Sequence, residues 1–266
     1  MKDSIINNFY EKMDNLNFDI FGILDKNNKI RTLGTDSKII SRIFEMFTQP
    51  ILEEIAWEHN LILKTPQKQT LYPDFILMTH EDSNAKIAID VKTTYEQTPL
   101  KFTLGSYGSY MRNNTKNIEY KYTDYIKHYV IGFVYKRNDA AQESRIYDYS
   151  DSKNIICPYS DVKYFIQEKY RIAGDKPGSG NTENIGSIST KNFDDFVFGR
   201  GPFSQLGPDI FDIYWKYYPK YRSTNKNYSS LQEFLVWLPK HISDVKLLHD
   251  FDPIQVLHQI HTYQTH

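Results

Sequence analysis

Hydrophobic positions along the chain repeat with two different periods, which separates expected helices from expected strands. Residues 3–14 look like a first helix, and residues 18–34 look like a β-hairpin that turns at the polar run DKNN. A second helix begins behind a cap at Asp36 or Ser37, and Pro50 predicts a kink within it. Its apolar positions at helical spacing are Ile40, Ile43, Phe47, Ile51 and Ile55.

Two runs farther along the chain have the composition of buried strands, yet each carries an acid. The first is residues 71–80, which contains Asp74, and the second is residues 86–95, which contains Asp90. Residues 128–136 form another strong strand, rich in β-branched and aromatic side chains. Helices and strands alternate without an internal repeat, and this pattern predicts an α/β fold.

The last third of the chain has a different pattern. Residues 174–187 are rich in glycine, serine and asparagine, and their composition predicts the most flexible stretch of the chain. A linker between domains would have a similar composition. The residues that follow are polar and aromatic, and we expect them to be mostly helical.

The acids on the two strands suggest a metal-binding catalytic site. Alternate residues of a strand point to the same side, so Asp90 and Lys92 share one face. Two carboxylates from neighbouring strands form an oxygen site that suits Mg²⁺, and Lys92 could hold an attacking water. The ordinary alternative is a local ion pair between Asp90 and Lys92 on a solvent-facing strand. The Pro-Asp motif at Asp74, with 15 residues between the two acids, favours the metal site.

Composition limits the classes of function. The 266 residues, 40% of them hydrophobic, are enough to bury a sizeable core. A net charge of -1 and a pI near 6.7 exclude a polycation that binds DNA through charge alone, so a DNA site must be local or metal-assisted. Cys157 is the single cysteine, which excludes an internal disulfide. The chain also shows no signal peptide and no apolar run of membrane-spanning length, so we expect a cytoplasmic protein without a membrane partner.

Several separated motifs together resemble the type II restriction endonucleases of the EcoRV type, within the PD-(D/E)xK nuclease superfamily. In chain order they are YPDF with KIAIDVKTTY, RNNTKNI, IAGD, and GSGNT with NIGS. The resemblance covers roughly residues 1–240. It implies a single nuclease domain with a mixed central β-sheet flanked by helices, and DNA-recognition loops near residues 65–70 and 174–187. Residues 241–266 form a C-terminal extension whose role the sequence does not indicate.

The resemblance also implies roles for particular side chains. Asp74 and Asp90 match the Mg²⁺-binding carboxylates, and Lys92 matches the catalytic lysine. Glu45 matches an acid that the family places near the metal on a helix. From the sequence alone, an ordinary solvated helix glutamate explains Glu45 equally well.

Two further segments resemble the loops with which this family contacts DNA. The base-recognition loop corresponds to Gly178, Ser179, Gly180, Asn181 and Thr182. Its glycines let the backbone approach base edges, and asparagine pairs well with adenine. A mobile surface connection is the ordinary alternative for such a stretch.

Gln69 matches the loop that approaches the minor groove. This loop departs from the family, because Thr70 stands in place of an asparagine and Leu71 in place of a histidine, which puts the minor-groove contacts in doubt. Expected phosphate contacts, which position a protein without reading sequence, are Ser37, Thr94, Arg112 and Lys116.

The function that the resemblance implies is Mg²⁺-dependent hydrolysis of both strands of double-stranded DNA at a short palindrome. The first guess for the site is GATATC, cut to blunt ends by in-line attack of a Lys92-assisted water, which leaves 5′-phosphate and 3′-hydroxyl ends. One chain type that reads a palindrome implies a two-fold homodimer. Two other functions stay open, namely a repair or junction-resolving nuclease on the same fold and a DNA-binding module without catalysis.

Other motifs are weak. His258 and His261 have the spacing of two metal ligands on a helix, but no third ligand is evident and a solvated helix face explains them. The glycine-rich stretch lacks the GK[ST] ending of a phosphate-binding loop, so we expect no nucleotide cofactor. No glycine-flanked serine elbow is present.

Overall fold

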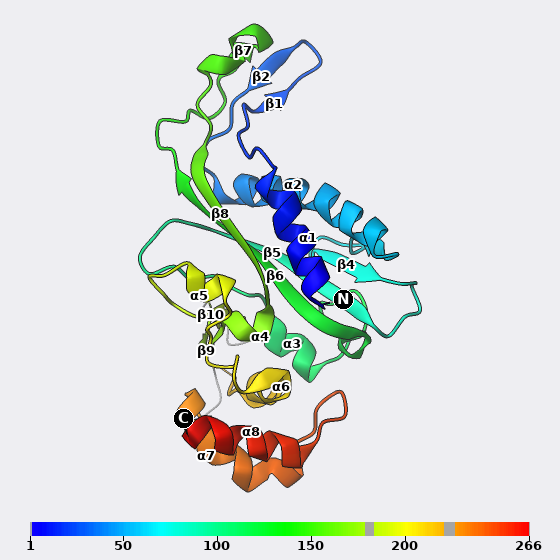
Figure 1. Ribbon diagram of the computed structural model, residues 1–266. Helices are drawn as coiled ribbons and strands as arrows, with labels where there is room; N and C mark the ends of the chain where they lie inside the picture. The colour runs from blue at the N-terminus through cyan, green and yellow to red at the C-terminus, as the bar shows by residue number, and fades with distance from the viewer. Residues whose placement is uncertain (1, 179–183, 221–226, 266) are drawn as a thin grey trace. The chain divides into compact units, whose positions relative to one another are not determined.

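The computed structural model describes residues 2–178, 184–220 and 227–265 (Figure 1). The chain divides into two compact units. Unit 1 comprises residues 1–59, 91–98 and 131–166, and unit 2 comprises residues 60–90, 99–130 and 167–266. Strands of one sheet contribute residues to both units. Among the described helices, none combines the length and the apolar composition that crossing a bilayer requires.

A mixed central sheet of five strands, flanked by helices, forms the framework within the described residues and confirms the predicted fold class. In spatial order its strands are β3 Ile62–Lys64, β4 Phe75–Met78, β5 Lys86–Tyr95, β6 Tyr125–Arg137 and β8 Tyr159–Glu168. Strand β4 pairs antiparallel with both β3 and β5. All four residues of β4 are buried, as the run of apolar residues predicts.

Unit 1 packs two helices together. They are α1 Lys2–Asp14 and α2 Ser37–Glu58, which confirm the two helices predicted at the start of the chain. Lys12 of α1 forms ion pairs with Glu54 at 3.0 Å and Glu58 at 2.7 Å of α2. Phe44 of α2 is fully buried and stacks on Phe133 of β6, with ring centroids 4.5 Å apart. The helix therefore contributes the aromatic side chain at the centre of the core of this unit.

The start of α2 follows from its capping residue. The carboxylate of Asp36 accepts hydrogen bonds from the backbone N–H groups of Lys38 at 2.8 Å and Ile39 at 3.2 Å, so Asp36 is the N-cap. Ser37 is the first helical residue. The predicted apolar stripe is also present, because Ile40, Ile51 and Ile55 are buried and Ile43 and Phe47 are half-buried. Pro50 lies inside the helix.

The predicted hairpin is confirmed as strands β1 Ile23–Leu24 and β2 Lys29–Arg31, which pair antiparallel. The carboxylate of Asp25 closes the turn by accepting from the N–H groups of Asn27 at 2.9 Å and Lys29 at 3.1 Å. Strand β7 Ile146–Asp148 pairs with β2 and completes a small three-stranded sheet, and the 3₁₀ turn η2 Tyr149–Asn154 follows.

Unit 2 contains most of the helices, as expected for the C-terminal third. They are α3 Tyr107–Arg112, α4 Lys169–Ile172, α5 Asp194–Val197, α6 Gly207–Tyr217, α7 Leu231–His241 and α8 Pro253–Thr265, with 3₁₀ turns η1 Tyr122–Asp124 and η3 Ile242–Asp244. Helix α6 is the most buried of the longer ones, and Trp215 on it is fully buried. The ring of its neighbour Tyr214 contacts the rings of Tyr228 and Phe234, at 5.2 and 5.0 Å between centroids. This aromatic cluster is the core of the helical part.

Both described ends of the stretch at residues 174–187 belong to strands. Strands β9 Ala173–Pro177 and β10 Ile185–Ser187 pair antiparallel (Figure 1). Gly178 lies so close to this partner strand that a Cβ would come within 2.6 Å of the carbonyl oxygen of Ile185. The glycines that predicted flexibility thus permit close approach of two backbones.

Candidate functional site

The register between β4 and β5 brings the two predicted metal-binding acids together. Phe75 lies opposite Ile89, and Ile76 lies opposite Ala88. Continuing this register by one residue sets Asp74, which directly precedes β4, opposite Asp90. Residues opposite one another in an antiparallel pair have Cβ atoms about 4.5–5.5 Å apart, so the two carboxylates can bind one ligand.

Asp90 is almost completely buried, with 4% of its surface exposed. Its Oδ2 atom accepts a hydrogen bond from Nζ of Lys169 at 3.0 Å, and the Lys169 side chain itself has no exposed surface. A buried carboxylate requires such a partner, because transferring an unpaired charge out of water is costly. Asp90 is therefore held inside the protein, which does not fit the alternative of a solvent-facing ion pair on this strand.

Aromatic side chains surround the two acids. Tyr110 of α3 is buried, and its ring stacks on that of Tyr72 with centroids 4.9 Å apart. The pKa of the Tyr110 hydroxyl is raised well above its ordinary value, first by burial and then by the charges of Asp90 and Asp74. One buried hydroxyl thus experiences both carboxylates, which agrees with their opposition in the sheet.

The donor set fits a hard divalent cation. The described residues contain no cluster of three or more histidine, cysteine, aspartate or glutamate side chains that could form a metal cage by themselves. Mg²⁺ does not require such a cage, since it is commonly held by one or two carboxylates, with waters and substrate phosphate oxygens completing the shell. Asp74 and Asp90 supply that number of carboxylates.

Lys92 follows Asp90 by two residues on the same continuous strand β5, so strand geometry directs the two side chains to the same face. The Lys92 side chain is half-buried, and its Nζ atom donates to the backbone carbonyl of Val91 at 3.1 Å. Its catalytic role stays a prediction.

Glu45, the fourth acid predicted near the metal, lies on α2 in unit 1 and is half-buried. Its Oε2 atom forms an ion pair with Arg42, one turn earlier, at 2.5 Å. Such a pair explains a helix glutamate without a metal. The role of Glu45 as a ligand stays a prediction.

Of the predicted recognition loop, the structure describes Gly178 and the strands on either side. The N–H group of Gly178 donates to the carbonyl of Asn184 at 2.8 Å, which continues the contact between the two strands. The other four residues, Ser179, Gly180, Asn181 and Thr182, lie outside the described residues. Their contacts with bases stay predictions.

The other predicted DNA contacts differ in their surroundings. Gln69 lies in an exposed turn just before the acids, and Ser37 and Lys116 are also exposed. Thr94 is half-buried on β5. Arg112 donates to the backbone carbonyls at the end of α6, at 3.1 Å to Lys216, 3.4 Å to Trp215 and 2.6 Å to Tyr218. Its guanidinium thus has a structural role, whatever it contributes to binding phosphate.

Sequence reasoning did not identify Lys169, the buried cation beside Asp90. This lysine directly follows β8 in the run IQEKYRIAG, where no periodicity indicates which side chain faces inward. Its position next to the acids is set by the pairing of distant segments. No feature of the sequence alone distinguishes it from an exposed lysine.

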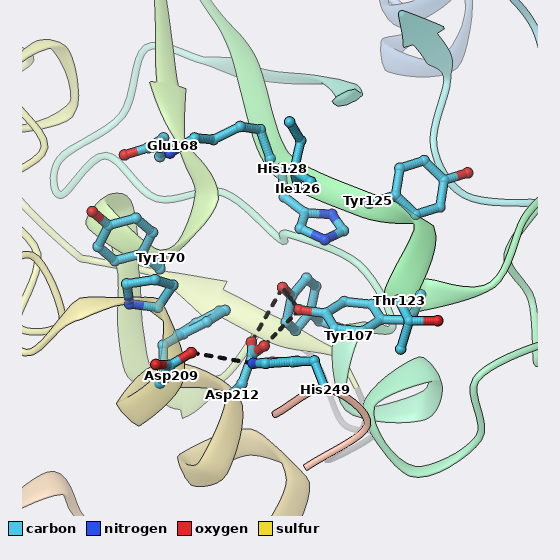
Figure 2. A pocket seen from close by; sticks show the side chains of 14 residues that line it. Tyr107, Thr123, Tyr125, Ile126, His128, Glu168, Tyr170, Asp209, Asp212 and His249 are labelled. Carbon is cyan, nitrogen blue, oxygen red and sulfur yellow. Dashed lines mark hydrogen bonds and ion pairs between the residues drawn. The ribbon is translucent and has the colours of Figure 1, made fainter. Parts of the chain in front are cut away.

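A pocket in unit 2 contains a second group of buried polar side chains (Figure 2). The carboxylate of Asp212 on α6 accepts hydrogen bonds from the hydroxyls of Tyr122 at 2.7 Å and Tyr107 at 3.3 Å. Burial raises the pKa of Asp212 to about 7. His249 bonds to Asp209 at 3.1 Å, which raises the pKa of its imidazole. His249 belongs to the C-terminal extension, which thus contributes to this pocket.

The two histidines that the sequence places at metal-ligand spacing, His258 and His261, are both exposed on α8. Neither belongs to a cluster of potential ligands within the described part of the chain. Their positions agree with a solvated helix face.

Comparison with known proteins gives one family and two similar proteins. The family model for the restriction endonuclease EcoRV matches residues 14–239. The type II restriction enzyme EcoRV from Escherichia coli is 43% identical over 243 residues, which are 90% of this chain and 97% of that protein. The solved structure of the NlaIV restriction endonuclease aligns with a TM-score of 0.37 and 10% identity, over 97% of this chain and 95% of the other.

Proposed function

This chain belongs to the EcoRV family of type II restriction endonucleases and is a site-specific deoxyribonuclease, and from that premise we propose how it cleaves DNA. We propose that it hydrolyses both strands of a short palindrome in the presence of Mg²⁺. The first candidate site is GATATC, cut to blunt ends with 5′-phosphates and 3′-hydroxyls. The chain would act as a homodimer on double-stranded DNA, without a nucleotide cofactor, in the cytoplasm.

One observation carries the proposal, namely the register that sets Asp74 opposite Asp90. Asp74 and Asp90 provide oxygen ligands. Lys92 follows Asp90 by two residues on β5 and provides a cation on the same face of the strand. EcoRV-type endonucleases generally use a divalent metal ion, and the two acids are the residues that would hold it here. When bound, the ion would supply positive charge beside the phosphate on which negative charge develops.

The protein side chains then have separate tasks. Asp74 and Asp90 present carboxylate oxygens from neighbouring positions of the sheet, which fixes where the scissile phosphate must lie. The Lys92 ammonium holds the attacking water by hydrogen bonding and offsets charge on the phosphate. The buried tyrosines Tyr72 and Tyr110 exclude bulk water from behind the acids, so the electrostatic interactions there are weakly screened.

Recognition of the site would come from two segments of unit 2. The loop that the hairpin β9–β10 carries, including Asn181, would read base edges in the major groove, and Gln69 would lie in the minor groove. Ser37, Thr94, Arg112 and Lys116 would contact phosphates and set the position of the DNA without reading its sequence. Thr70 and Leu71 are the positions at which minor-groove contacts would differ from those of the family.

The test is digestion of a sequenced supercoiled plasmid with and without Mg²⁺, followed by mapping of the fragment ends. We expect discrete fragments that end at one palindrome, cleavage that EDTA abolishes, and no fragments from the Asp90→Ala variant. Asp90→Ala also removes the carboxylate partner of the buried Lys169 and can lose stability for that reason, so Asp74→Ala, which keeps this pair, is the inactive variant that should still bind DNA. Cleavage only of branched DNA, or undiminished cleavage by the Asp90→Ala variant, would contradict the proposal.

A further inference from the structure

Lys169 is a fully buried lysine whose ammonium lies against a proposed metal ligand. Its Nζ atom donates to Oδ2 of Asp90 at 3.0 Å and to the backbone carbonyl of Leu104 at 3.2 Å. Neither the Lys169 side chain nor Asp90 has more than 5% of its side-chain surface exposed. A buried charge at this place requires an explanation, since lysine is among the residues least often fully buried.

Aromatic rings hold the ammonium on its other sides. Nζ of Lys169 lies 4.1 Å from the ring centroid of Tyr72 and 5.5 Å from that of Tyr107, both within the range of a cation–π contact. Each tyrosine is fixed in turn through its hydroxyl. Tyr72 bonds to Nδ1 of His128 at 2.8 Å, and Tyr107 bonds to Tyr122 at 2.6 Å.

The pocket of Figure 2 shows how the second of these tyrosines is anchored. The hydroxyls of Tyr107 and Tyr122 both donate to the carboxyl group of Asp212, and Figure 2 shows Tyr107 directed at this group. A continuous set of contacts therefore runs from this carboxyl group through Tyr107 to Lys169 and on to Asp90. The position of the ammonium is specified by several neighbours.

Stability alone is a weak reason to keep such a lysine. Burying an ion pair removes two charges from water, and apolar replacements of similar volume are often neutral or stabilising. What the pair does provide is a fixed orientation for the Asp90 carboxyl group. Side chains that hydrogen-bond a metal ligand from behind orient that ligand and tune its metal.

We propose that Lys169 is a positioning residue for the nuclease reaction, which holds Asp90 by Oδ2 so that its carboxylate faces Asp74. The ammonium also balances the charge of two opposed acids inside the protein before a metal binds. This inference rests on the proposed function, because it requires Asp90 to be a metal ligand. Lys169 need not touch the DNA or the reacting phosphate.

Two consequences distinguish this role from simple packing. Without the ammonium, Asp90 loses a partner that orients it, so cleavage at saturating metal should slow by about 10- to 100-fold. The buried carboxylate also loses a charge that keeps it ionised, so the metal should bind only at higher concentration. A residue that only stabilised the fold would change neither quantity.

The test uses the full-length protein with Lys169→Met, which keeps the length of the side chain and removes its charge. Lys86→Met is the matched control, because Lys86 is also buried, bonds to the carbonyl of Ser83 and lies 4.2 Å from the ring of Tyr120, on the same strand as Asp90. Single-turnover cleavage is measured against Mg²⁺ concentration. The rise in melting temperature with added Mg²⁺ or Ca²⁺, without DNA, gives the metal midpoint independently of activity.

We expect Lys169→Met to lower the saturating rate and to shift the metal midpoint to higher concentration, while Lys86→Met changes neither. A saturating rate equal to that of the unmodified protein, or a midpoint that does not rise, would overturn the inference. If Lys169→Met fails to fold, Lys169→Gln serves instead: its uncharged amide can still donate to Asp90, so we expect a smaller fall in rate with a higher midpoint, and no change in either would overturn the inference. Absence of any metal response in the unmodified protein would overturn the proposed function and this inference together.

Discussion

Substitution of Lys92 distinguishes a catalytic role of this side chain from a purely structural one. If Lys92 helps to hold the nucleophile, Lys92→Ala should reduce the single-turnover cleavage rate at saturating Mg²⁺ by about 10²- to 10⁴-fold. Its effect on the melting temperature should be small, because a half-exposed charged side chain contributes about 0–1 kcal/mol. A near-normal rate with a lowered melting temperature would instead give Lys92 a structural role.

At the scale of single residues, the sequence predicts the two acids of the site but not the buried lysine beside them. Asp74 and Asp90 were predicted because their spacing is a motif, and the register of β4 with β5 sets them opposite one another. Lys169 was not predicted, because the contact between Lys169 and Asp90 joins segments 79 residues apart. Local pattern contains no information about such a pair, which the folded topology creates.

The raised pKa of Asp212 makes the free energy of unfolding depend on pH. The carboxyl group has an ordinary pKa of 3.8, and burial raises its pKa to about 7 in the folded protein. The folded state therefore binds this proton more tightly, so the free energy of unfolding falls as the pH rises between these values. The slope approaches about 1.4 kcal/mol per pH unit, and the loss is complete above the folded pKa.

The Asp212→Asn variant isolates this contribution, because an amide does not titrate. Denaturant unfolding of both proteins at pH 5 and pH 8 should show a smaller loss of stability with rising pH in the variant. The pair of His249 and Asp209 remains in both proteins and loses stabilisation in the same direction, so the difference between them reports Asp212 together with its electrostatic coupling to His249. Equal pH dependence in the two proteins would show that Asp212 is ionised in the folded state.

At the scale of elements, the pairing of β9 with β10 is a feature that composition does not reveal. Glycine-rich runs predict loops, because glycine has the most backbone freedom to lose. Here Gly178 and Gly186 lie where two backbones nearly touch, with 3.1 Å from a Cβ on Gly186 to the Cα of Gly178. By contrast, α1, α2 and β5 follow directly from their periodicity and capping residues. Long periodic elements are encoded locally, whereas short paired strands depend on their partners.

The proposed base-recognition segment, residues 178–182, yields a prediction about specificity. Asn181→Ala should lose about 1–3 kcal/mol of discrimination at an adenine position of the site, because a bidentate contact to the base is removed. Affinity for unrelated DNA should change little, since phosphate contacts supply it. The measurement is cleavage of the cognate site beside sites altered at one base pair. A variant that keeps the parental preference would show that the loop only connects two strands.

At the scale of the whole molecule, the proposed cleavage of both strands of a palindrome calls for two copies of the active site. Unit 1 exposes several large apolar side chains on the small sheet and the segment beside it. With their exposed fractions they are Phe21 47%, Ile23 60%, Leu24 54%, Ile146 56% and Tyr149 59%. Exposed apolar side chains gathered in one region mark interaction sites, and the proposed homodimer would bury them in both copies.

Replacement of Ile23 and Leu24 by aspartate should therefore convert a dimer to a monomer in sedimentation experiments, since burying four unpaired carboxylates across a two-fold interface is costly. The monomer should fold normally, because both side chains are exposed. Ile254→Asp is the control, because Ile254 is 79% exposed on α8 in the other unit. The double variant should lose double-strand cleavage of the plasmid while the control retains it. A double variant that stays dimeric and still linearises the plasmid would place the interface elsewhere on the chain.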